Sequence, residues 1–385
     1  MLSKTFRLSS SASLLRSSIS ASTRLNLSKS SQRLFYPSFI SHAKMSTDTV
    51  VPPLQTAFIY HPGQFELEQK EIPVPTPEPG NVLLKIVAAG VCHSDLHVLA
   101  GSLPYPDGLI LGHEVVGTIV GYGDGVNKEL YPAGTLFAAH GPNPCGICKP
   151  CRTGADNLCV QPTRSHLGLG SPGGYEQYTQ INPRNLTAVP EGISPAVAAV
   201  STDAVLTPYH ALKRAKINGL TKLLIIGLGG LGINGVQVAK AFGAHVTAVD
   251  LKDSSRDLAK SFGADVVYDK LPEEPLEVDV VADFVGIQST FELAQKHVKP
   301  AGLIMPIGLG ATHLTFDLGA FAFKEFEILG NFWGTSQDQV EVFELVKKGL
   351  VTPQIETTSY LNVNTVLKNL HDGHIKSRMV LVHDS

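Results

Sequence analysis

The chain has 385 residues, with 31 Lys and Arg against 34 Asp and Glu, and a formal net charge of −3 at pH 7. This length suffices for about two domains, and a charge so close to neutral gives no reason to expect a nucleic-acid partner. No run reaches the roughly 18 apolar residues that cross a bilayer, so we expect no membrane association.

The N-terminal segment differs from the rest of the chain. Residues 1–44 contain seven basic residues, neither Asp nor Glu, and abundant serine. This composition is typical of a mitochondrial transit peptide, and the segment lacks the compact apolar core of a secretory signal. We therefore expect import into the mitochondrial matrix, with a plain disordered tail as the alternative reading. Met45 is a plausible second start that would give a cytoplasmic form.

The first half of the chain reads as strands followed by an irregular lobe. Runs of β-branched and apolar residues predict strands over 54–60, 82–89 and 115–120. Residues 140–174 are instead rich in Gly, Pro and Cys and show little periodicity. Because such a stretch can bury little apolar surface, we expect a bound metal to stabilise its fold.

Four of the five cysteines lie in this lobe, spaced C-x2-C-x2-C-x7-C. Thiolates at this spacing can converge on one tetrahedral zinc, and four of them leave no open position for a substrate. Their clustering indicates metal ligands rather than a secreted disulfide framework. We therefore predict a closed, structural zinc site at Cys145, Cys148, Cys151 and Cys159.

From about residue 204 the pattern changes to alternating strands and helices. This alternation predicts an α/β fold with a doubly wound parallel sheet of the Rossmann type. The predicted strands are Lys222–Ile226, His245–Val249, Asp265–Tyr268, Val278–Val285, Leu303–Ile307 and Ile328–Phe332. The predicted helices are Leu231–Phe242, Ser254–Phe262, Ser289–Val298 and Gln337–Lys348.

A glycine-rich turn follows the first of these strands. The run Gly227-Leu228-Gly229-Gly230-Leu231-Gly232 fits G-x-G-x-x-G and opens a helix. In this motif the first glycine permits a tight turn, the second lets the backbone approach a pyrophosphate, and the third allows close helix–strand packing. Asp250 ends the next strand, where a carboxylate can accept from the ribose 2′-hydroxyl of NAD. Lys252 lies close to Asp250 and tempers a strict preference for NAD over NADP.

The fifth cysteine suggests a second, open metal site. Cys92 follows the predicted strand 82–89, and Gly112-His113-Glu114 lies about twenty residues later. A catalytic zinc needs three protein ligands and one exchangeable position. Cys92 and His113 would supply a thiolate and an imidazole to such a site.

The order of these features resembles the zinc-dependent medium-chain alcohol dehydrogenases. Cys92, the Gly-His-Glu triplet, the four-cysteine lobe, the glycine motif and Asp250 follow one another as in that family, over about residues 54–382. The resemblance implies a GroES-like β-barrel catalytic domain over 45–203 with its zinc lobe at 140–174, a Rossmann domain over 204–335, and a return to the catalytic domain over 336–385. It implies two zinc ions per subunit, NAD as cofactor, a small alcohol, aldehyde or ketone substrate, and a homo-oligomer, dimer or tetramer.

Roles at the catalytic metal are carried over residue by residue from the family. The resemblance implies Cys92, His113 and Asp203 as zinc ligands, although the family usually has Cys at the third place. It implies Ser94 and His97 as a proton relay and Glu114 as a flexible carboxylate near the metal. Asp95 resembles the carboxylate that orients the zinc-ligand imidazole. Plain alternatives are a turn hydroxyl for Ser94 and a surface histidine for His97.

The family also implies contacts to the cofactor and substrate. His93 and Arg378 would reach cofactor phosphates, although an exposed salt-bridging arginine is the alternative for Arg378. Thr207 would lie against the nicotinamide. By rough family position, the substrate pocket is lined by Leu96, Tyr105, His140 and Trp333.

Some features of the sequence argue against other classes of function. A zinc-finger-like binding module would leave the glycine motif unexplained and conflicts with 24 basic against 34 acidic residues after position 44. A non-catalytic relative that keeps only cofactor binding would not need Cys92, His113 and Ser94. Within the family, polyol (sorbitol-type) dehydrogenases commonly have Glu as the third ligand. NADP-dependent cinnamyl-type reductases usually have Ser where Asp250 stands.

Overall fold

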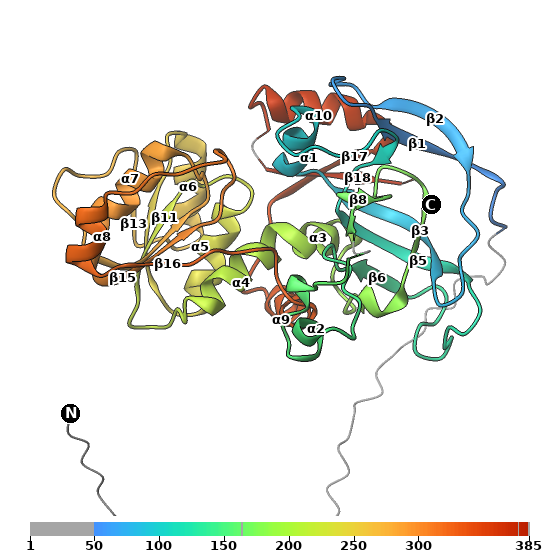
Figure 1. Cartoon of the computed structure of the whole chain (residues 1–385), viewed down its shortest axis with the longest axis horizontal. Helices are drawn as coiled ribbons and strands as arrows, with labels where there is room; N and C mark the ends of the chain where they lie inside the picture. The colour runs from blue at the N-terminus through green and yellow to red at the C-terminus, as the bar shows by residue number, and fades with distance from the viewer. Residues whose placement is uncertain (1–49, 163–164, 376, 384–385) are drawn as a thin grey trace, which may run out of the picture. The chain divides into compact units, whose positions relative to one another are not determined.

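The computed structural model describes residues 50–162, 165–375 and 377–383 (Figure 1). The predicted transit peptide at 1–44 lies outside these residues. Within the described ranges, no helix is both long enough and apolar enough to cross a bilayer.

The largest sheet contains strands from both ends of the described chain. Seven strands form it in the order β10-β6-β5-β3-β18-β17, and β9 also pairs with β3. Figure 1 shows β3 and β5 beside the C-terminal strands β17 and β18, and β18 runs antiparallel to β3. Its strands are β3 (Val82–Gly90), β5 (Glu114–Tyr122), β6 (Leu136–Ala139), β9 (Tyr178–Ile181), β10 (Leu186–Ala188), β17 (Ile355–Ser359) and β18 (Arg378–Val382).

Two smaller sheets accompany it in the described residues. The strand predicted over 54–60 is confirmed as β1 (Leu54–Tyr60), the centre of a three-stranded sheet with β2 (Glu68–Pro73) and β4 (Leu109–Ile110). The short strands β7 (His166–Leu167) and β8 (Gly170–Ser171) pair with each other.

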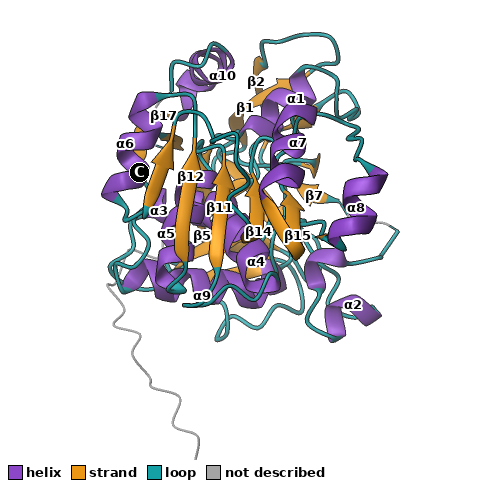
Figure 2. Cartoon of the chain, turned by 90° about the vertical axis from the view of Figure 1, so that its left-hand side faces the viewer, coloured by secondary structure: helices purple, strands orange, loops and turns teal. Residues whose placement is uncertain are grey.

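The predicted doubly wound parallel sheet is confirmed. Its strand order is β13-β12-β11-β14-β15-β16, and all five pairings are parallel (Figure 2). The chain therefore reverses direction across the sheet between β11 and β14, where folds of this kind bind dinucleotides. Its strands are β11 (Lys222–Ile226), β12 (His245–Val249), β13 (Val266–Tyr268), β14 (Val278–Asp283), β15 (Val298–Pro306) and β16 (Glu327–Ile328).

Helices cover both faces of this sheet, and the side chains of the central strand β11 therefore pack alternately into two hydrophobic clusters. Leu223 and Ile225 of β11 lie in the cluster that contains α5 residues, whereas Leu224 and Ile226 lie in the one that contains α7 residues. This explains why the strand reads as an unbroken apolar run. The covering helices are α5 (Gly232–Ala241), α6 (Asp253–Ser261), α7 (Gln288–His297) and α8 (Leu318–Lys324).

Several predicted strands are wrong in extent. β15 begins at Val298 rather than Leu303, and β14 ends at Asp283 rather than Val285. The expected strand Ile328–Phe332 shrinks to β16, Glu327–Ile328, at the edge of the sheet. Beyond it the chain leaves the sheet, and the Phe332 carbonyl accepts from the side chain of Asn157 at 2.7 Å. An apolar run at an edge strand does not by itself show how far pairing continues, since only one neighbour specifies it.

The remaining helices connect and cover the sheets. The predicted helix near Gln337–Lys348 is confirmed as α9 (Ser336–Lys347), which begins after an N-cap at Thr335. The others are α1 (His93–Leu99), α2 (Lys149–Arg152), α3 (Pro195–Val200), α4 (Leu206–Arg214), α10 (Val363–His371), the π-helical turn η3 (Ser201–Val205), and the short 3₁₀ turns η1 (Asp156–Leu158), η2 (Pro183–Asn185) and η4 (Tyr360–Asn362).

Candidate active site

The register of two strands brings Cys92 and His113 together. In the antiparallel β3–β5 pair, Gly90 lies opposite Glu114. Cys92 follows β3 and is the N-cap residue of α1, while His113 immediately precedes β5. Cys92 and His113 are both buried. The separation of about twenty residues seen in the sequence is therefore the length of the connection between two paired strands.

Asp203 reaches the same point from a buried helical turn. It lies in η3, a π-helical turn between α3 and α4, all five residues of which are buried. Such wide turns are rare and occur mostly at functional sites. The Thr207 hydroxyl donates to Oδ1 of Asp203 at 2.6 Å, which leaves Oδ2 facing the other two residues.

Four potential metal-binding side chains converge here. Donor atoms of Cys92, His113, Glu114 and Asp203 all lie within 4.8 Å of one another. Oδ2 of Asp203 lies 3.5 Å from Sγ of Cys92 and 3.7 Å from Nε2 of His113. A tetrahedral zinc with bonds of about 2.0–2.3 Å places its ligand atoms roughly 3.3–3.8 Å apart. The predicted ligand set Cys92, His113 and Asp203 therefore fits a zinc ion in both chemistry and spacing.

The ionisation of Asp203 also suits a ligand. Burial opposes its charge, but the neighbouring His113 and the hydrogen bond from Thr207 outweigh burial and hold the pKa of Asp203 at about 2. Asp203 is therefore a carboxylate near neutral pH, and a carboxylate oxygen is an accepted zinc ligand.

Glu114 is paired with an arginine from the C-terminal strand. Burial raises the pKa of Glu114 to about 8, although the charge of Arg378 opposes that rise. The Arg378 guanidinium donates to Oε1 of Glu114. Oε2 is buried and has no hydrogen-bond partner among the described residues. Arg378 itself is only 5% exposed, so the alternative of an exposed salt-bridging arginine is wrong.

A second carboxylate lies behind the imidazole. Oδ1 of Asp95 lies 3.4 Å from Nδ1 of His113, and Oδ2 accepts from the Tyr175 hydroxyl at 2.8 Å. An outer carboxylate of this kind fixes the orientation and tautomer of a metal-binding histidine. Gly112 makes room for this arrangement, since it has φ of +91° and a Cβ there would lie 2.6 Å from the Tyr175 ring.

The four lobe cysteines form a separate cluster. Their sulfur atoms all lie within 4.8 Å of one another, and none is in a disulfide. Sulfur–sulfur distances are 3.3 Å for Cys148–Cys151, 3.8 Å for Cys148–Cys159 and 3.9 Å for Cys145–Cys151. Zn–S bonds of about 2.3 Å predict tetrahedral edges of roughly 3.8 Å. The lobe therefore fits the predicted structural zinc.

A cavity of about 720 Å³ lies next to the first metal cluster. Val91 and His93, which flank Cys92, line one part of it, and Gly229 and Gly230 of the glycine motif line another. Six of the predicted cofactor residues line this cavity: His93, Gly229, Gly230, Asp250, Lys252 and Arg378.

The glycine motif has the predicted geometry. Gly227 has φ of +85°, as a tight turn after β11 requires. A Cβ at Gly229 would meet nothing within 4 Å, so the backbone there is open to the cavity. A Cβ at Gly232 would run into the Gly227 carbonyl, which accounts for the third glycine. Leu231 is the N-cap residue of α5.

Asp250 is held in a fixed orientation at the cavity wall. Its two carboxylate oxygens accept from the backbone N–H groups of Leu228 at 2.7 Å and Lys252 at 2.8 Å. A carboxylate has about four acceptor sites, so further acceptor capacity remains for a ribose hydroxyl. The Lys252 ammonium instead donates to the Gly373 carbonyl at 3.4 Å.

Comparisons with known proteins agree with this geometry. Residues 78–191 match the family model described as "Alcohol dehydrogenase GroES-like domain", and residues 230–348 match "Zinc-binding dehydrogenase". An alcohol dehydrogenase of Geobacillus stearothermophilus is 34% identical over 82% of this chain and 95% of its own length. The chain belongs to the zinc-dependent medium-chain alcohol dehydrogenases. The predicted GroES-like and Rossmann architecture is confirmed with it.

Solved structures of the family match almost their whole length. Acetophenone reductase from Geotrichum candidum NBRC 4597, solved in complex with NAD, is 57% identical with a TM-score of 0.85, over 87% of this chain and 98% of that one. The alcohol dehydrogenase of Aeropyrum pernix is 29% identical with a TM-score of 0.79, over 85% and 99%.

The other predicted residues of this dehydrogenase take the following places. Ser94 and His97 lie one turn apart on α1, and Oγ of Ser94 lies 3.7 Å from Sγ of Cys92. Leu96, Tyr105 and Trp333 belong to one hydrophobic cluster, and Trp333 packs edge-on against the His113 ring at 5.4 Å between centroids. Nε2 of the fully buried His140 donates to the Gly334 carbonyl at 2.8 Å, so that nitrogen is committed to structure.

Sequence reasoning missed several supporting residues of the site. Tyr175 holds Asp95, and Thr202 accepts from the Trp333 indole at 3.0 Å through its carbonyl. The pairing of Arg378 with Glu114 is likewise absent from the sequence prediction, in which Arg378 reaches a cofactor phosphate. None of these contacts leaves a pattern in the sequence, since each joins segments far apart in the chain.

Replacing Asp250 with Ser should change the choice between the two nicotinamide cofactors. The variant loses the charge-assisted hydrogen bond between the Asp250 carboxylate and the ribose 2′-hydroxyl of NAD, worth about 1.5–3 kcal/mol. It also no longer repels the 2′-phosphate of NADP. We expect the ratio of kcat/KM with NAD to kcat/KM with NADP to fall about 10- to 100-fold. Asp253→Ser is the matched control, since that side chain is 89% exposed. Equal ratios in the two variants would contradict the ribose assignment.

Proposed function

We propose that this protein interconverts secondary alcohols and ketones, including aromatic ketones, with NAD as the hydride carrier. The observation that carries the proposal is the convergence of Cys92, His113 and Asp203 on one point beside the cavity that Asp250 and the glycine motif line. The 57% identity to an acetophenone reductase supports the substrate class.

A zinc ion held by Cys92, His113 and Asp203 would supply Lewis-acid chemistry, and NAD held along the cavity with Asp250 would supply hydride transfer. The chain supplies position and proton transfer. Asp95 and Thr207 orient His113 and Asp203, respectively. The Ser94 hydroxyl, whose Oγ lies 3.7 Å from Sγ of Cys92, can accept the proton of a substrate alcohol while it passes on its own hydroxyl proton. His97, one turn further along α1, is partly exposed and can pass that proton to solvent.

The test is a kinetic screen of the purified protein with both nicotinamide cofactors. We expect acetophenone with NADH to give a kcat/KM at least about tenfold above cinnamaldehyde with NADPH, and above sorbitol with NAD. The Lewis-acid site makes no distinction among these, so the difference has to come from pocket shape and from Asp250. A preference for sorbitol would indicate the polyol type. A preference for cinnamaldehyde with NADPH would indicate the cinnamyl type.

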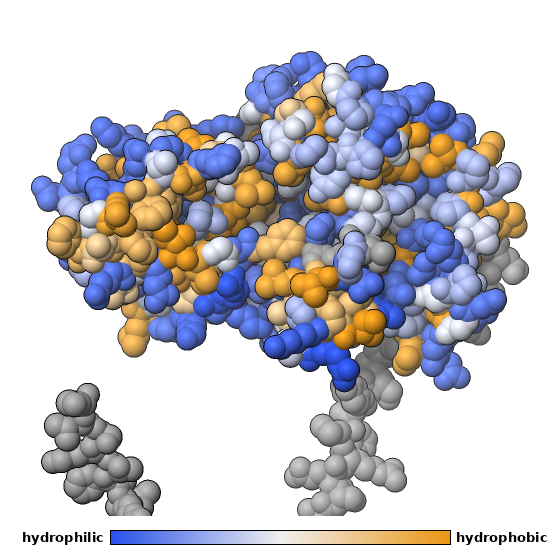
Figure 3. Space-filling model, viewed as in Figure 1, coloured by the Kyte–Doolittle hydropathy of each residue, from blue (hydrophilic) through white to orange (hydrophobic). Residues whose placement is uncertain are grey.

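We further propose a homo-oligomer that covers the apolar edge of the parallel sheet. Figure 3 shows hydrophobic side chains gathered over the region that carries α8. Phe323 is 92% exposed and Leu318 is 70% exposed there, next to the edge strand β16. Large exposed apolar side chains beside an open edge are typical of a protein interface. A monomer mass by light scattering would contradict this.

We also propose residence in the mitochondrial matrix, on the composition of residues 1–44. Fractionation of cells that express the full chain would test this, and recovery solely in the cytoplasm would contradict it.

A further inference from the structure

One short connection joins the two metal clusters. Residues 331–336 lie between the edge strand β16, which ends at Ile328, and α9, whose first residue is Ser336. Side chains of the four-cysteine lobe bond to this segment, and Trp333 within it contacts Thr202 and His113. The strand predicted over 328–332 ends at Ile328, and Phe332 instead accepts a hydrogen bond from Asn157.

Two residues of the cysteine lobe hold this connection on one side. Asp156 and Asn157 belong to η1, the turn between Cys151 and Cys159. Oδ1 of Asp156 accepts from the Ser336 N–H at 3.1 Å, and the Asp156 carboxylate also accepts from the Ser336 hydroxyl. Nδ2 of Asn157, which is buried, donates to the Phe332 carbonyl at 2.7 Å.

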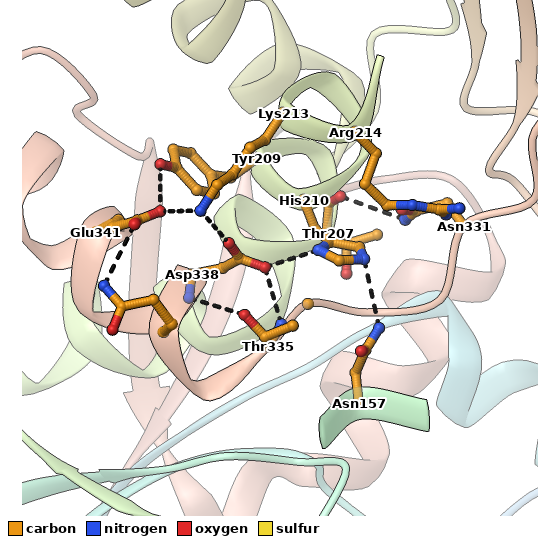
Figure 4. A network of polar contacts seen from close by, with 12 residues as sticks. Asn157, Thr207, Tyr209, His210, Lys213, Arg214, Asn331, Thr335, Asp338 and Glu341 are labelled. Atoms are coloured by element: carbon orange, nitrogen blue, oxygen red, sulfur yellow. Dashed lines mark hydrogen bonds and ion pairs between the residues drawn. The ribbon is translucent and has the colours of Figure 1, made fainter. Parts of the chain in front are cut away.

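Asn157 also leads into a buried polar network (Figure 4). Its Nδ2 lies 3.4 Å from Nε2 of His210, whose Nδ1 lies 2.7 Å from Oδ2 of Asp338. Since an amide nitrogen only donates and a carboxylate only accepts, His210 carries its proton on Nδ1. Asp338 in turn accepts from the Thr335 N–H at 3.0 Å and from Lys213 at 2.8 Å. The network therefore fixes the connection at Thr335 as well.

On its other side the connection supports the catalytic ligands. The Trp333 indole donates to the carbonyl of Thr202, the neighbour of Asp203, and its ring packs against His113. Trp333 has φ of +51°, a left-handed conformation that bulky residues adopt only when their surroundings impose it. The hydrogen bonds to Phe332 and Ser336, on either side of Trp333, are such constraints.

We propose that Asp156 and Asn157 are positioning residues for the catalytic centre, acting through residues 331–336 and the Trp333 side chain. The four-cysteine lobe would then have a second role besides its own stability, because it would hold in place the Trp333 ring against which His113 packs. This inference rests on the proposed function for its kinetic part and on the geometry alone for its structural part.

The test uses the fact that Trp333 is the single tryptophan of the chain. Asn157→Asp keeps the size of the side chain but has no N–H to donate to the Phe332 carbonyl. We expect Trp333 emission to move to longer wavelength and acrylamide quenching to increase, because the ring relaxes toward solvent. We expect kcat to fall about tenfold with KM for NAD unchanged, because the cofactor cavity is lined by other residues.

Two further variants complete the design. Asp156→Ala removes the contact to Ser336 without placing an additional charge in the interior, and should show the same changes to a smaller extent. Arg152→Ala is the control, an exposed residue of the same lobe that should leave emission and kcat unchanged. Zinc analysis of all three variants shows whether the lobe keeps its metal.

The outcomes separate this inference from the proposed function. Emission and kcat equal to those of Arg152→Ala in both the Asp156 and Asn157 variants would overturn the positioning role. A protein inactive on every alcohol and ketone would overturn the proposed function, yet the fluorescence comparison would still decide the structural role of the two residues.

Discussion

Replacing Cys92 with Ser should reduce kcat by about 10³- to 10⁴-fold while the fold stays intact. A metal in Lewis-acid catalysis contributes several kcal/mol to stabilisation of the transition state, and each 1.36 kcal/mol is a factor of ten in rate. A serine hydroxyl is a poor zinc ligand beside a thiolate. With Sγ removed, His113 and Asp203 are the remaining predicted ligands at this point.

The measurements are steady-state kinetics and zinc analysis on the same preparation. Zinc should fall from about two ions to about one per chain, because the four-cysteine cluster is unaffected. The thermal midpoint should change little, since Cys92 lies outside β3 and the pairing of β3 with β5 persists. Full activity with two bound zinc ions would remove Cys92 from the ligand set.

The second large effect concerns stability. Cys148→Ser should lower the free energy of unfolding by several kcal/mol, because structural zinc sites contribute folding free energy directly. Backbone N–H groups of Cys151 and Val160 lower the pKa of the Cys148 thiol, so it is well prepared to bind a metal as thiolate. The lobe around it is short of apolar packing, and α2 has no buried residue.

Chemical denaturation and limited proteolysis of the lobe would measure this change. Ile147→Ser is a matched control, since its side chain is 71% exposed and only its backbone N–H approaches Cys145. We expect new cleavage within residues 140–174 for Cys148→Ser alone. Comparable stability of the two variants would show that the four cysteines carry no structural metal.

The parallel sheet was the most predictable part of the fold. Apolar β-branched strands, alternating helices and the glycine turn act through neighbours in the sequence, so their pattern survives in one dimension. The helical stretch from Pro195 to Arg214 gave no such signal. It is buried on nearly all sides, and buried polar residues such as Asp203 and His210 interrupt its apolar residues, so hydrophobicity along the sequence does not mark it as a helix.

The catalytic centre was predictable in composition but not in assembly. Cys92, His113 and Asp203 were matched through a resemblance, and the structure brings their donor atoms together. The pairing of Glu114 with Arg378, and the hydrogen bond from Asn157 to the Phe332 carbonyl, join residues more than 170 positions apart in the chain. Contacts of that kind follow from the folded geometry alone.

The two metal clusters differ in how much of the polypeptide each one needs. The lobe thiolates all come from residues 145–159, whereas the catalytic cluster needs Cys92, His113 and Asp203, and Arg378 completes its surroundings. A growing chain emerging from the ribosome thus displays the first set as one short stretch, but the second only after most of translation is done. Local contacts form early and distant ones late. Metal capture by the lobe can therefore precede synthesis of the nucleotide-binding half, while activation must await the C-terminal strand.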